Sequence, residues 1–251
     1  MFLSVFDMFK VGVGPSSSHT MGPMVAGGRF LEHLRSLPFA AAGLRARLYG
    51  SLAFTGKGHA TDRATILGLA GMLPDSYDAE RAEAVLAANR ATGRLSPPGL
   101  PQMRFDPEHD LIFDFGPALP GHANGMVIEA LDAQGDVIAQ ETYYSIGGGF
   151  VLSAAEQAAL GPKDLEAPSP VPFPFRSAAE MLAMAHGSGL SIAQMKRRNE
   201  RRFRTDAEID AGLARVWAVM NDCISRGLAT EGVLPGGLKV KRRAKAIHEA
   251  L

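Results

Sequence analysis

A segment with proline at every second position divides this 251-residue chain into two parts of different character. The segment reads Ala167-Pro168-Ser169-Pro170-Val171-Pro172-Phe173-Pro174-Phe175. Proline fixes φ and has no backbone N–H, so such a run indicates an extended linker rather than part of a helix or a sheet. Helix and strand patterns are mixed before the segment, whereas helix patterns follow it. We therefore predict an α+β domain over residues 1–160, a linker over 161–176 and a helical region over 177–251.

Alternating apolar residues mark the first predicted strand. Over residues 44–55 the apolar side chains fall on one face and the polar side chains on the other, which is the period of a half-buried strand. The apolar face consists of Leu44, Ala46, Leu48, Leu52 and Phe54. Helical patterns lie on either side, over 24–34 and 64–72. Further strands are predicted at 111–115, 126–131 and 137–144, and the last two flank a hairpin loop, which gives the domain an antiparallel component.

Capping boxes, in which Ser or Thr is followed three residues later by Glu or Gln, predict the helix starts after the linker. They begin at Ser177, Ser191 and Thr205. The third opens a helix with an apolar stripe, which we expect to face a core. The stripe consists of Leu213, Val216, Trp217, Met220, Cys223 and Ile224.

The charge balance argues against a nucleic-acid partner. The chain has 26 Lys and Arg against 26 Asp and Glu, whereas a surface that neutralises phosphates needs an excess of cations. No apolar run reaches the length of about 18 residues that a membrane span needs. The N-terminus lacks a basic start and is interrupted by Asp7 and Lys10, so it does not resemble a signal peptide, and we expect a cytoplasmic protein without membrane contact.

A single cysteine, Cys223, limits the covalent chemistry of the chain. One cysteine forms no internal disulfide, which fits a reducing compartment. It also cannot hold a structural zinc or an iron–sulfur cluster by itself. We therefore predict no metal ligands in this chain.

A hydroxyl-rich turn precedes the first predicted helix. It reads Gly12-Val13-Gly14-Pro15-Ser16-Ser17-Ser18-His19-Thr20. Its hydroxyls and glycines, with the free N–H groups of the helix start, suit a carboxylate or a phosphate. The alternative is a helix N-cap in a polar turn, but one cap needs one hydroxyl rather than several polar residues and a histidine.

A second histidine follows the alternating strand, in Thr55-Gly56-Lys57-Gly58-His59-Ala60-Thr61-Asp62-Arg63. We expect the turn to enter a helix capped by Thr61 or Asp62, which would fix the backbone of His59 while leaving its ring accessible. The ordinary pKa of histidine, near 6.5, suits proton transfer at neutral pH. The alternative, a flexible surface turn with a solvated His and Lys, stays open on these residues alone.

Two further loops are explained by structure at least as well as by function. His122-Ala123-Asn124-Gly125 precedes the predicted hairpin and contains Asn-Gly, which is a turn signal. The hairpin ends in Gly147-Gly148-Gly149, which is typical of a connector.

A basic run extends from Lys239 to Arg243 near the end of the sequence. It indicates a solvated face, or alternatively a cationic wall for a carboxylate substrate.

Together, and in order over essentially the whole chain, these segments resemble the N-terminal part of bacterial iron–sulfur L-serine dehydratases, the L-serine ammonia-lyases. The matching segments are Ser4-Val5-Phe6-Asp7, Pro15 to Thr20 with Gly22-Pro23-Met24, the Gly-Lys-Gly-His turn, Tyr143 to Phe150, Phe173-Pro174-Phe175 and Leu234 to Leu238. One departure is Ala123, where the family usually has proline between His and Asn.

The resemblance implies an N-terminal domain like the allosteric substrate-binding domain of some phosphoglycerate dehydrogenases, followed by the start of an all-α catalytic domain. It implies a [4Fe-4S] cluster held by cysteines that this chain lacks, with an iron acting as Lewis acid on the hydroxyl of L-serine. Pyruvate and ammonia would be the products of β-elimination. The implied partners are L-serine and either a second copy or a complementary α-domain chain.

The resemblance also implies roles for particular residues. The candidate catalytic residues are His59 and His19, with His59 expected to be the base. The candidate substrate-binding residues are Ser16, Ser18, Thr20, His122 and Asn124. Two other functions stay open: a regulatory or small-molecule-sensing subunit without catalysis, and, more weakly, a phosphate-binding hydrolase built on the serine-rich turn.

Overall fold

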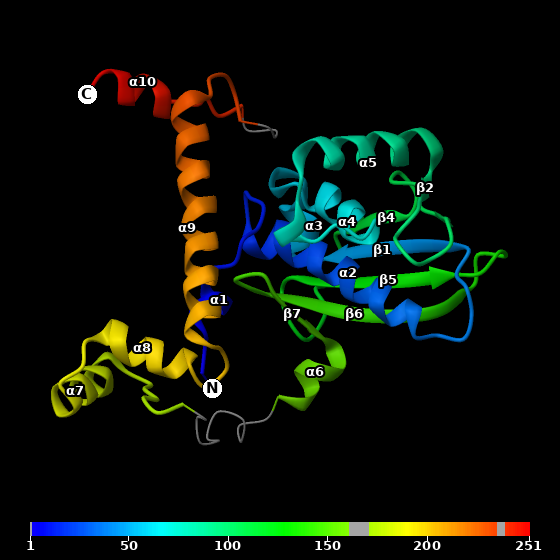
Figure 1. Cartoon of the computed structure of the whole chain (residues 1–251). Helices are drawn as coiled ribbons and strands as arrows, with labels where there is room; N and C mark the ends of the chain where they lie inside the picture. Colours follow the sequence, from blue (N-terminus) through cyan, green and yellow to red (C-terminus); the bar gives the residue numbers. More distant parts are fainter. Residues whose placement is uncertain (1, 161–170, 235–238) are drawn as a thin grey trace. The chain divides into compact units, whose positions relative to one another are not determined.

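The computed structural model describes residues 2–160, 171–234 and 239–251, which form two compact units (Figure 1). The sheet unit comprises Gly12–Ala159 and Gly232–Lys241, and the helical unit comprises Met1–Val11, Leu160–Glu231 and Arg242–Leu251. The N-terminal eleven residues thus group with the helices. The domain bounds predicted above, 1–160, 161–176 and 177–251, stay a prediction. Most of the predicted linker and Pro235 to Leu238 lie outside the described residues.

The sheet unit is built on a mixed seven-stranded sheet of order β2-β3-β1-β5-β6-β7, with β4 also paired to β1. Its strands are β1 Gly43–Tyr49, β2 Arg94–Leu95, β3 Met103–Arg104, β4 Leu111–Asp114, β5 Gly125–Leu131, β6 Val137–Gly147 and β7 Phe150–Ser153. Strand β1 runs parallel to β3 and β4 and antiparallel to β5. The predicted hairpin is present as the antiparallel pair β5–β6. The unit is therefore α+β with an antiparallel component, as predicted.

The first predicted strand is half right, because β1 ends at Tyr49 rather than at residue 55. Gly50 has φ of 53°, a left-handed conformation that breaks the strand and that glycine adopts without steric cost. A Cβ at this position would also lie 2.4 Å from the carbonyl oxygen of Ala123. The chain then forms the short helix α3 Ser51–Phe54. As a result Leu52 is buried as predicted, but Phe54 is 63% exposed.

Two predicted helices, α2 Gly22–Arg35 and α4 Thr61–Leu69, pack together in the sheet unit. Helix α2 also contacts β5, β6 and β7, and Figure 1 shows it running along these strands. The apolar side chains between these elements form one buried core, which includes Met24, Phe30, Leu48 and Ile128. Burial of such side chains supplies most of the stability of a domain of this kind.

Five further helices belong to the described part of the sheet unit. They are the short helices η1 Ser17–Met21, η2 Gly56–His59 and η3 Pro74–Ser76, with α5 Ala79–Thr92 and α6 Ala154–Ala159. Helix α5 was not predicted, since its sequence is rich in alanine and charge and has a weak apolar face. It begins at the side-chain cap of Asp78 and ends at Gly93 in the left-handed conformation.

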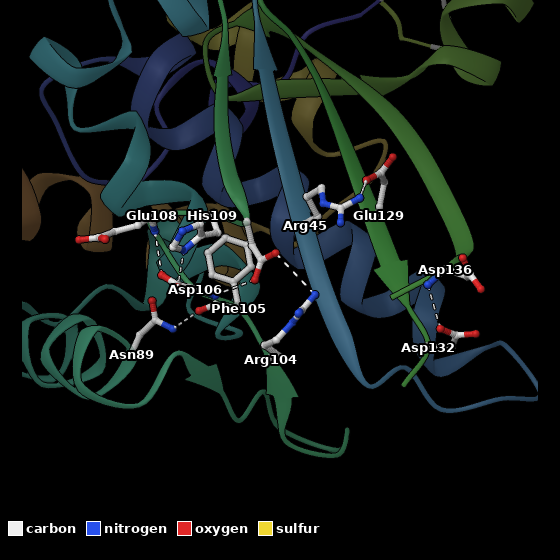
Figure 2. A network of polar contacts seen from close by, with 11 residues as sticks. Arg45, Asn89, Arg104, Phe105, Asp106, Glu108, His109, Glu129, Asp132 and Asp136 are labelled. Atoms are coloured by element: carbon white, nitrogen blue, oxygen red, sulfur yellow. Dashed lines mark hydrogen bonds and ion pairs between the residues drawn. The ribbon is translucent and has the colours of Figure 1, made fainter. Parts of the chain in front are cut away.

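A polar network ties the end of α5 to the edge of the sheet (Figure 2). The buried Asn89 donates its amide to the carbonyl oxygens of Phe105, at 2.8 Å, and Arg94, at 3.1 Å. In the following loop Asp110 accepts from the backbone N–H of Asp106, and Asp106 pairs with His109 at 2.9 Å. The hydrogen bond and charge of Asp106 raise the pKa of His109. These contacts hold the connection from β3 to β4 in one conformation.

The helical unit contains α1 Val5–Met8, α7 Ala178–Ser188, α8 Ile192–Glu200, α9 Asp206–Ala229 and α10 Ala244–Glu249. The predicted caps at Ser177, Ser191 and Thr205 are confirmed, the last two as complete capping boxes. Across the described residues, none of the helices combines the length and the apolar character needed to cross a lipid bilayer.

The prediction that the apolar stripe of α9 faces a core is wrong for the described residues. Leu213, Trp217, Met220 and Ile224 are between 40% and 63% exposed, and Cys223 is exposed as well. The period of the stripe was correctly identified, but periodicity does not show whether a partner element packs against that face.

A buried carboxylate anchors the N-terminus within the helical unit. Glu200, 2% exposed, accepts from the backbone N–H of Val5 at 2.7 Å and from the Ser4 hydroxyl at 2.8 Å. Arg204 pairs with the same carboxylate at 3.1 Å. Hydrogen bonds to an ionised group inside a protein are stronger than neutral ones. The N-terminal turn and α8 therefore form one structural element.

The contact between α2 and α4 depends on small residues. A Cβ on Gly68 would lie 2.4 Å from the carbonyl oxygen of Met24, which is backbone and cannot move cheaply. We expect Gly68→Ala to destabilise the protein by about 2 kcal/mol, as overpacking does, despite the better helix propensity of alanine. Chemical denaturation measures the change. The matched control is Gly187→Ala in α7, where a Cβ meets nothing within 4 Å. Equal stability of the two variants would contradict this account.

The Glu200 anchor makes a second prediction. Glu200→Gln removes the charge from a site with three donors, so we expect a loss of roughly 2 kcal/mol and faster hydrogen exchange at Val5 and Phe6. Amide exchange followed by NMR or mass spectrometry measures this. Glu249→Gln, at an exposed position of α10, is the control. Unchanged exchange at residues 4–9 in Glu200→Gln would show that the carboxylate is not the anchor.

Candidate active site

The hydroxyl-rich turn folds as the π-helical turn η1, which leads directly into α2. Ser16 is its N-cap, with the hydroxyl accepting from the backbone N–H of His19 at 3.1 Å. The Thr20 hydroxyl in turn accepts from the N–H of Ser16 at 3.2 Å. The interpretation of this turn as a helix N-cap is therefore correct for Ser16. The other polar side chains of the turn form hydrogen bonds with other partners.

Both ring nitrogens of His19 are hydrogen-bonded to hydroxyls. Nδ1 lies 2.9 Å from Ser18 Oγ, and Nε2 lies 2.9 Å from Ser51 Oγ at the start of α3. Burial lowers the pKa of His19, and the neighbouring His59 lowers it further, because both disfavour the protonated ring. The neutral form of the His19 ring is therefore favoured, and both of its nitrogens are fixed by hydrogen bonds.

His59 is the last residue of η2, and its ring is held on one side only. Nδ1 lies 2.9 Å from the carbonyl oxygen of Thr55. A carbonyl oxygen only accepts, so Nδ1 carries the proton in the neutral ring and Nε2 carries the free electron pair. Among the described residues, no hydrogen bond to Nε2 of His59 is present. This is the arrangement that a general base needs.

The residue after His59 has an unusual backbone. Ala60 has φ of 54°, which is left-handed and uncommon for a residue with a Cβ. Ala60 is also the N-cap of α4 and provides no side-chain cap, so the expected cap by Thr61 or Asp62 is wrong. Strain of this kind is often found beside functional residues, where the surrounding structure holds it in place.

The two histidine turns are bonded to each other reciprocally. Thr20, next to His19, donates its hydroxyl to the carbonyl oxygen of His59 at 2.8 Å. Thr61, two residues after His59, donates its hydroxyl to the carbonyl oxygen of His19 at 2.7 Å. The ring centroids lie 4.8 Å apart and the rings are tilted by 38°. The structure thus brings Ser16, Ser18, His19, Thr20 and His59 together.

The loop of His122 and Asn124 reaches this site through the backbone. The carbonyl oxygen of Ala123 accepts from the N–H of Ser51 at 2.8 Å. Asn124 donates its side-chain amide to the carbonyl oxygen of Ser145 at 3.1 Å, and its backbone carbonyl oxygen accepts from the Ser145 N–H at 2.9 Å. The His122 ring accepts locally, from the N–H of Asn124. Neither side chain forms a hydrogen bond with His19 or His59 in the described part of the chain.

Sequence reasoning missed three residues of the site. The alternating pattern predicts Ser51 on the polar face of a strand and the helix start predicts Thr61 as a cap, whereas no role is predicted for Ser145. Ser145 is 3% exposed, and its hydroxyl finds no hydrogen-bond partner among the described residues. It lies against Gly22, where a Cβ would be 2.0 Å from Ser145 Oγ. Only the three-dimensional contacts identify these residues, since each is a single hydroxyl in an ordinary pattern.

The described residues do not fit an iron–sulfur cluster or another metal ion. Cys223, the single cysteine of the sequence, is exposed on α9. Within the described ranges, no group of three His, Cys, Asp or Glu side chains is placed to hold a metal. What these residues do provide is one imidazole with a free electron pair, a second imidazole held neutral, and hydroxyls beside a helix start.

A comparison with protein families finds that residues 4–156 match the serine dehydratase beta chain. The chain is 46% identical to L-serine dehydratase TdcG of Escherichia coli K12 over 252 residues, which is 99% of this chain and 54% of that protein. It is 44% identical to an L-serine dehydratase of Streptomyces coelicolor over 246 residues, 97% of this chain and 54% of the relative. An L-serine dehydratase of Haemophilus influenzae is 41% identical over 253 residues, which is 99% of this chain and 54% of that protein.

The chain therefore spans about half the length of the curated relatives that it matches. The similarity itself extends over nearly all of this chain and includes both histidine turns. On this match and on the identity to these relatives, the chain belongs to the serine dehydratase beta chain family.

Proposed function

We propose that this chain forms part of an L-serine ammonia-lyase, which converts L-serine to pyruvate and ammonia. The names of the relatives support the substrate and the reaction. The observation that carries the proposal in this chain is the pair of histidines with different hydrogen bonding, beside a hydroxyl-rich helix start. β-Elimination from an amino acid needs a base at the Cα proton and a binding site for the carboxylate.

His59 is the proposed base. Its Nδ1–H is bonded to the Thr55 carbonyl, so Nε2 is free to take a proton. When Nε2 takes the Cα proton of serine, the electron pair forms the Cα–Cβ double bond and the bond from Cβ to the hydroxyl breaks. The proton taken up by His59 balances the departing hydroxide, so the net loss is one molecule of water. The aminoacrylate that results isomerises to an imine, and hydrolysis of the imine gives pyruvate and ammonia. The water released in the first step balances the water used in the last.

His19 is proposed to orient the substrate rather than to move its proton. Both of its nitrogens already have hydroxyl partners, and its pKa is lowered, so it is proposed to act through the serine hydroxyls that it holds in place. The N–H groups of the turn are proposed to bind the carboxylate, and Ser16 and Ser18 are proposed to shape this binding site through their hydrogen bonds with each other and with His19. Thr20 is buried and its hydroxyl is bonded twice, so its contribution is to hold the turn. His122 and Asn124 stay proposed as substrate-binding residues.

Other features are proposed for the complete protein rather than for this chain. The helical region from residue 177 would be the start of an all-α catalytic domain, and the protein would be cytoplasmic. A [4Fe-4S] cluster would supply Lewis acidity, but the single cysteine here does not form a ligand set. No step above is therefore assigned to it. A second copy or a complementary chain would supply what this chain lacks.

A second candidate function is a regulatory subunit that binds serine without converting it. The absence of a cluster ligand set from the described residues favours this for the chain in isolation. Two measurements separate the two functions. Calorimetry measures whether the chain binds L-serine, and activity assays of a complete protein measure whether L-serine is converted. Binding by the chain, with no activity in any complete form, would favour the regulatory function.

The roles of the two histidines can be separated by kinetics. We would use a chimera in which this chain replaces the matching part of TdcG. A general base contributes about 10²–10⁴-fold in rate, so His59→Ala should lower kcat by that order. His19→Ala should mainly raise KM, because it acts in binding. His109→Ala, at an exposed position outside the site, is the control and should leave both constants unchanged.

Steady-state kinetics and solvent exchange at Cα measure these effects. Circular dichroism and iron content check that each variant is folded and loaded. If His59→Ala keeps a near-normal kcat while His19→Ala abolishes turnover, the two roles are exchanged.

The 251-residue chain alone should bind no stoichiometric cluster and should have no serine dehydratase activity. The reason is that one cysteine does not supply the several thiolates that hold a [4Fe-4S] cluster. Anaerobic reconstitution with iron and sulfide, followed by visible absorbance and iron analysis, measures this. The chimera described above is the positive control. A full cluster with pyruvate formation by the chain alone would contradict the prediction.

A further inference from the structure

The short helix α3 and its C-cap Thr55 connect the two histidine rings, since Ser51 at the helix start bonds to His19 and Thr55 bonds to His59. At its first residue, Ser51 Oγ lies 2.9 Å from Nε2 of His19. The backbone of Ser51 is itself fixed, because its N–H donates to the carbonyl oxygen of Ala123 at 2.8 Å. The hydroxyl therefore reaches His19 from a backbone that is held in place.

The other end of the same turn holds His59. The carbonyl oxygen of Ser51 accepts from the Thr55 N–H at 3.0 Å and from the Thr55 hydroxyl at 2.9 Å. The carbonyl oxygen of Thr55 then accepts from Nδ1 of His59 at 2.9 Å. One helical turn thus connects a hydroxyl on one imidazole to a carbonyl on the other.

The hydroxyls around His19 allow a continuous direction of donation from Ser16 through Ser18 to the ring. Ser16 Oγ already accepts from the His19 backbone N–H, so its proton is available to Ser18 Oγ, 3.4 Å away. The proton of Ser18 can then point to Nδ1 of His19 at 2.9 Å. In this order Nδ1 is the acceptor and Nε2 carries the proton, which leaves Ser51 Oγ as its acceptor.

We propose that Ser51 is a positioning residue, whose hydroxyl fixes the Nε2–H tautomer and the orientation of the His19 ring, and that α3 thereby sets the spacing of the two imidazoles. A role of Ser51 in catalysis rests on the proposed function. The effect of Ser51 on the tautomer of His19 is independent of that function. Without this hydroxyl, Nε2–H would lose its partner in a partly buried site, and the preference between the two tautomers would weaken.

The test is long-range ¹H–¹⁵N NMR of the imidazoles in the full 251-residue chain. We expect wild-type His19 to be the Nε2–H tautomer. In Ser51→Ala the Nδ1 and Nε2 shifts of His19 should move toward each other, as in a tautomer mixture, while His59 stays Nδ1–H. Ser51→Thr keeps the hydroxyl and should restore the wild-type pattern. Ser17→Ala is the matched control, because Ser17 is exposed and its side chain bonds to neither ring.

The outcomes separate this inference from the proposed function. An Nδ1–H tautomer of His19 in the wild type would overturn it, and so would unchanged His19 shifts in a folded Ser51→Ala. If the shifts respond as expected but the wild-type chimera with TdcG has no activity, Ser51 still positions His19 and the proposed function fails instead. In an active chimera we expect Ser51→Ala to lower kcat/KM about tenfold, an effect that the threonine variant should largely reverse.

Discussion

The candidate site depends on a pair of reciprocal hydrogen bonds between its two histidine turns. Each turn carries a threonine whose hydroxyl donates to the backbone carbonyl of the histidine in the other turn, Thr20 to His59 and Thr61 to His19. Both hydroxyls are buried, so breaking either bond would leave an unpaired polar group inside the protein. The two bonds are accepted by backbone carbonyl oxygens. They therefore fix the backbone position from which each histidine side chain extends and leave the ring nitrogens free for other partners. The close packing of α2 on α4 through Gly27 and Gly68 brings the two turns to this distance.

What differs between the two imidazoles is the chemistry of their partners. His19 has a hydroxyl on each nitrogen, and hydroxyls can donate or accept, so its state is set by the whole chain of serines. His59 has a backbone carbonyl on one nitrogen, which only accepts, so its tautomer is set by a single contact. Two residues of the same type, with rings 4.8 Å apart, are thereby suited to different tasks. Burial lowers the pKa of His19, and the neighbouring His59 lowers it further, so the neutral form of the His19 ring is favoured.

Much of this arrangement could be predicted from local sequence patterns, and the exceptions have physical causes. The hairpin, the helices around the first strand and the helix caps follow from periodicity and cap chemistry, which are local. The strand at 44–55 was predicted too long because Leu52 keeps the alternating pattern in a helical turn that Gly50 makes possible. The α9 stripe was assigned to a core because a period identifies a face but not its partner. At the site, the polar turns predict His19 and His59 as candidate functional residues. The contribution of Ser51 is not predicted, because it arises from a contact with a residue 32 positions away in the sequence.

The central claim is that the two imidazoles are held in different states, with His59 ready to accept a proton at Nε2. The most direct test is the tautomer of His59 in the 251-residue chain at neutral pH, read from its two ring ¹⁵N shifts. The account predicts that Nδ1 carries the proton, because it faces the Thr55 carbonyl, and that Nε2 has the shift of an unprotonated nitrogen. A predominant Nε2–H tautomer of His59 would contradict it, since the nitrogen assigned to take the Cα proton would already be protonated.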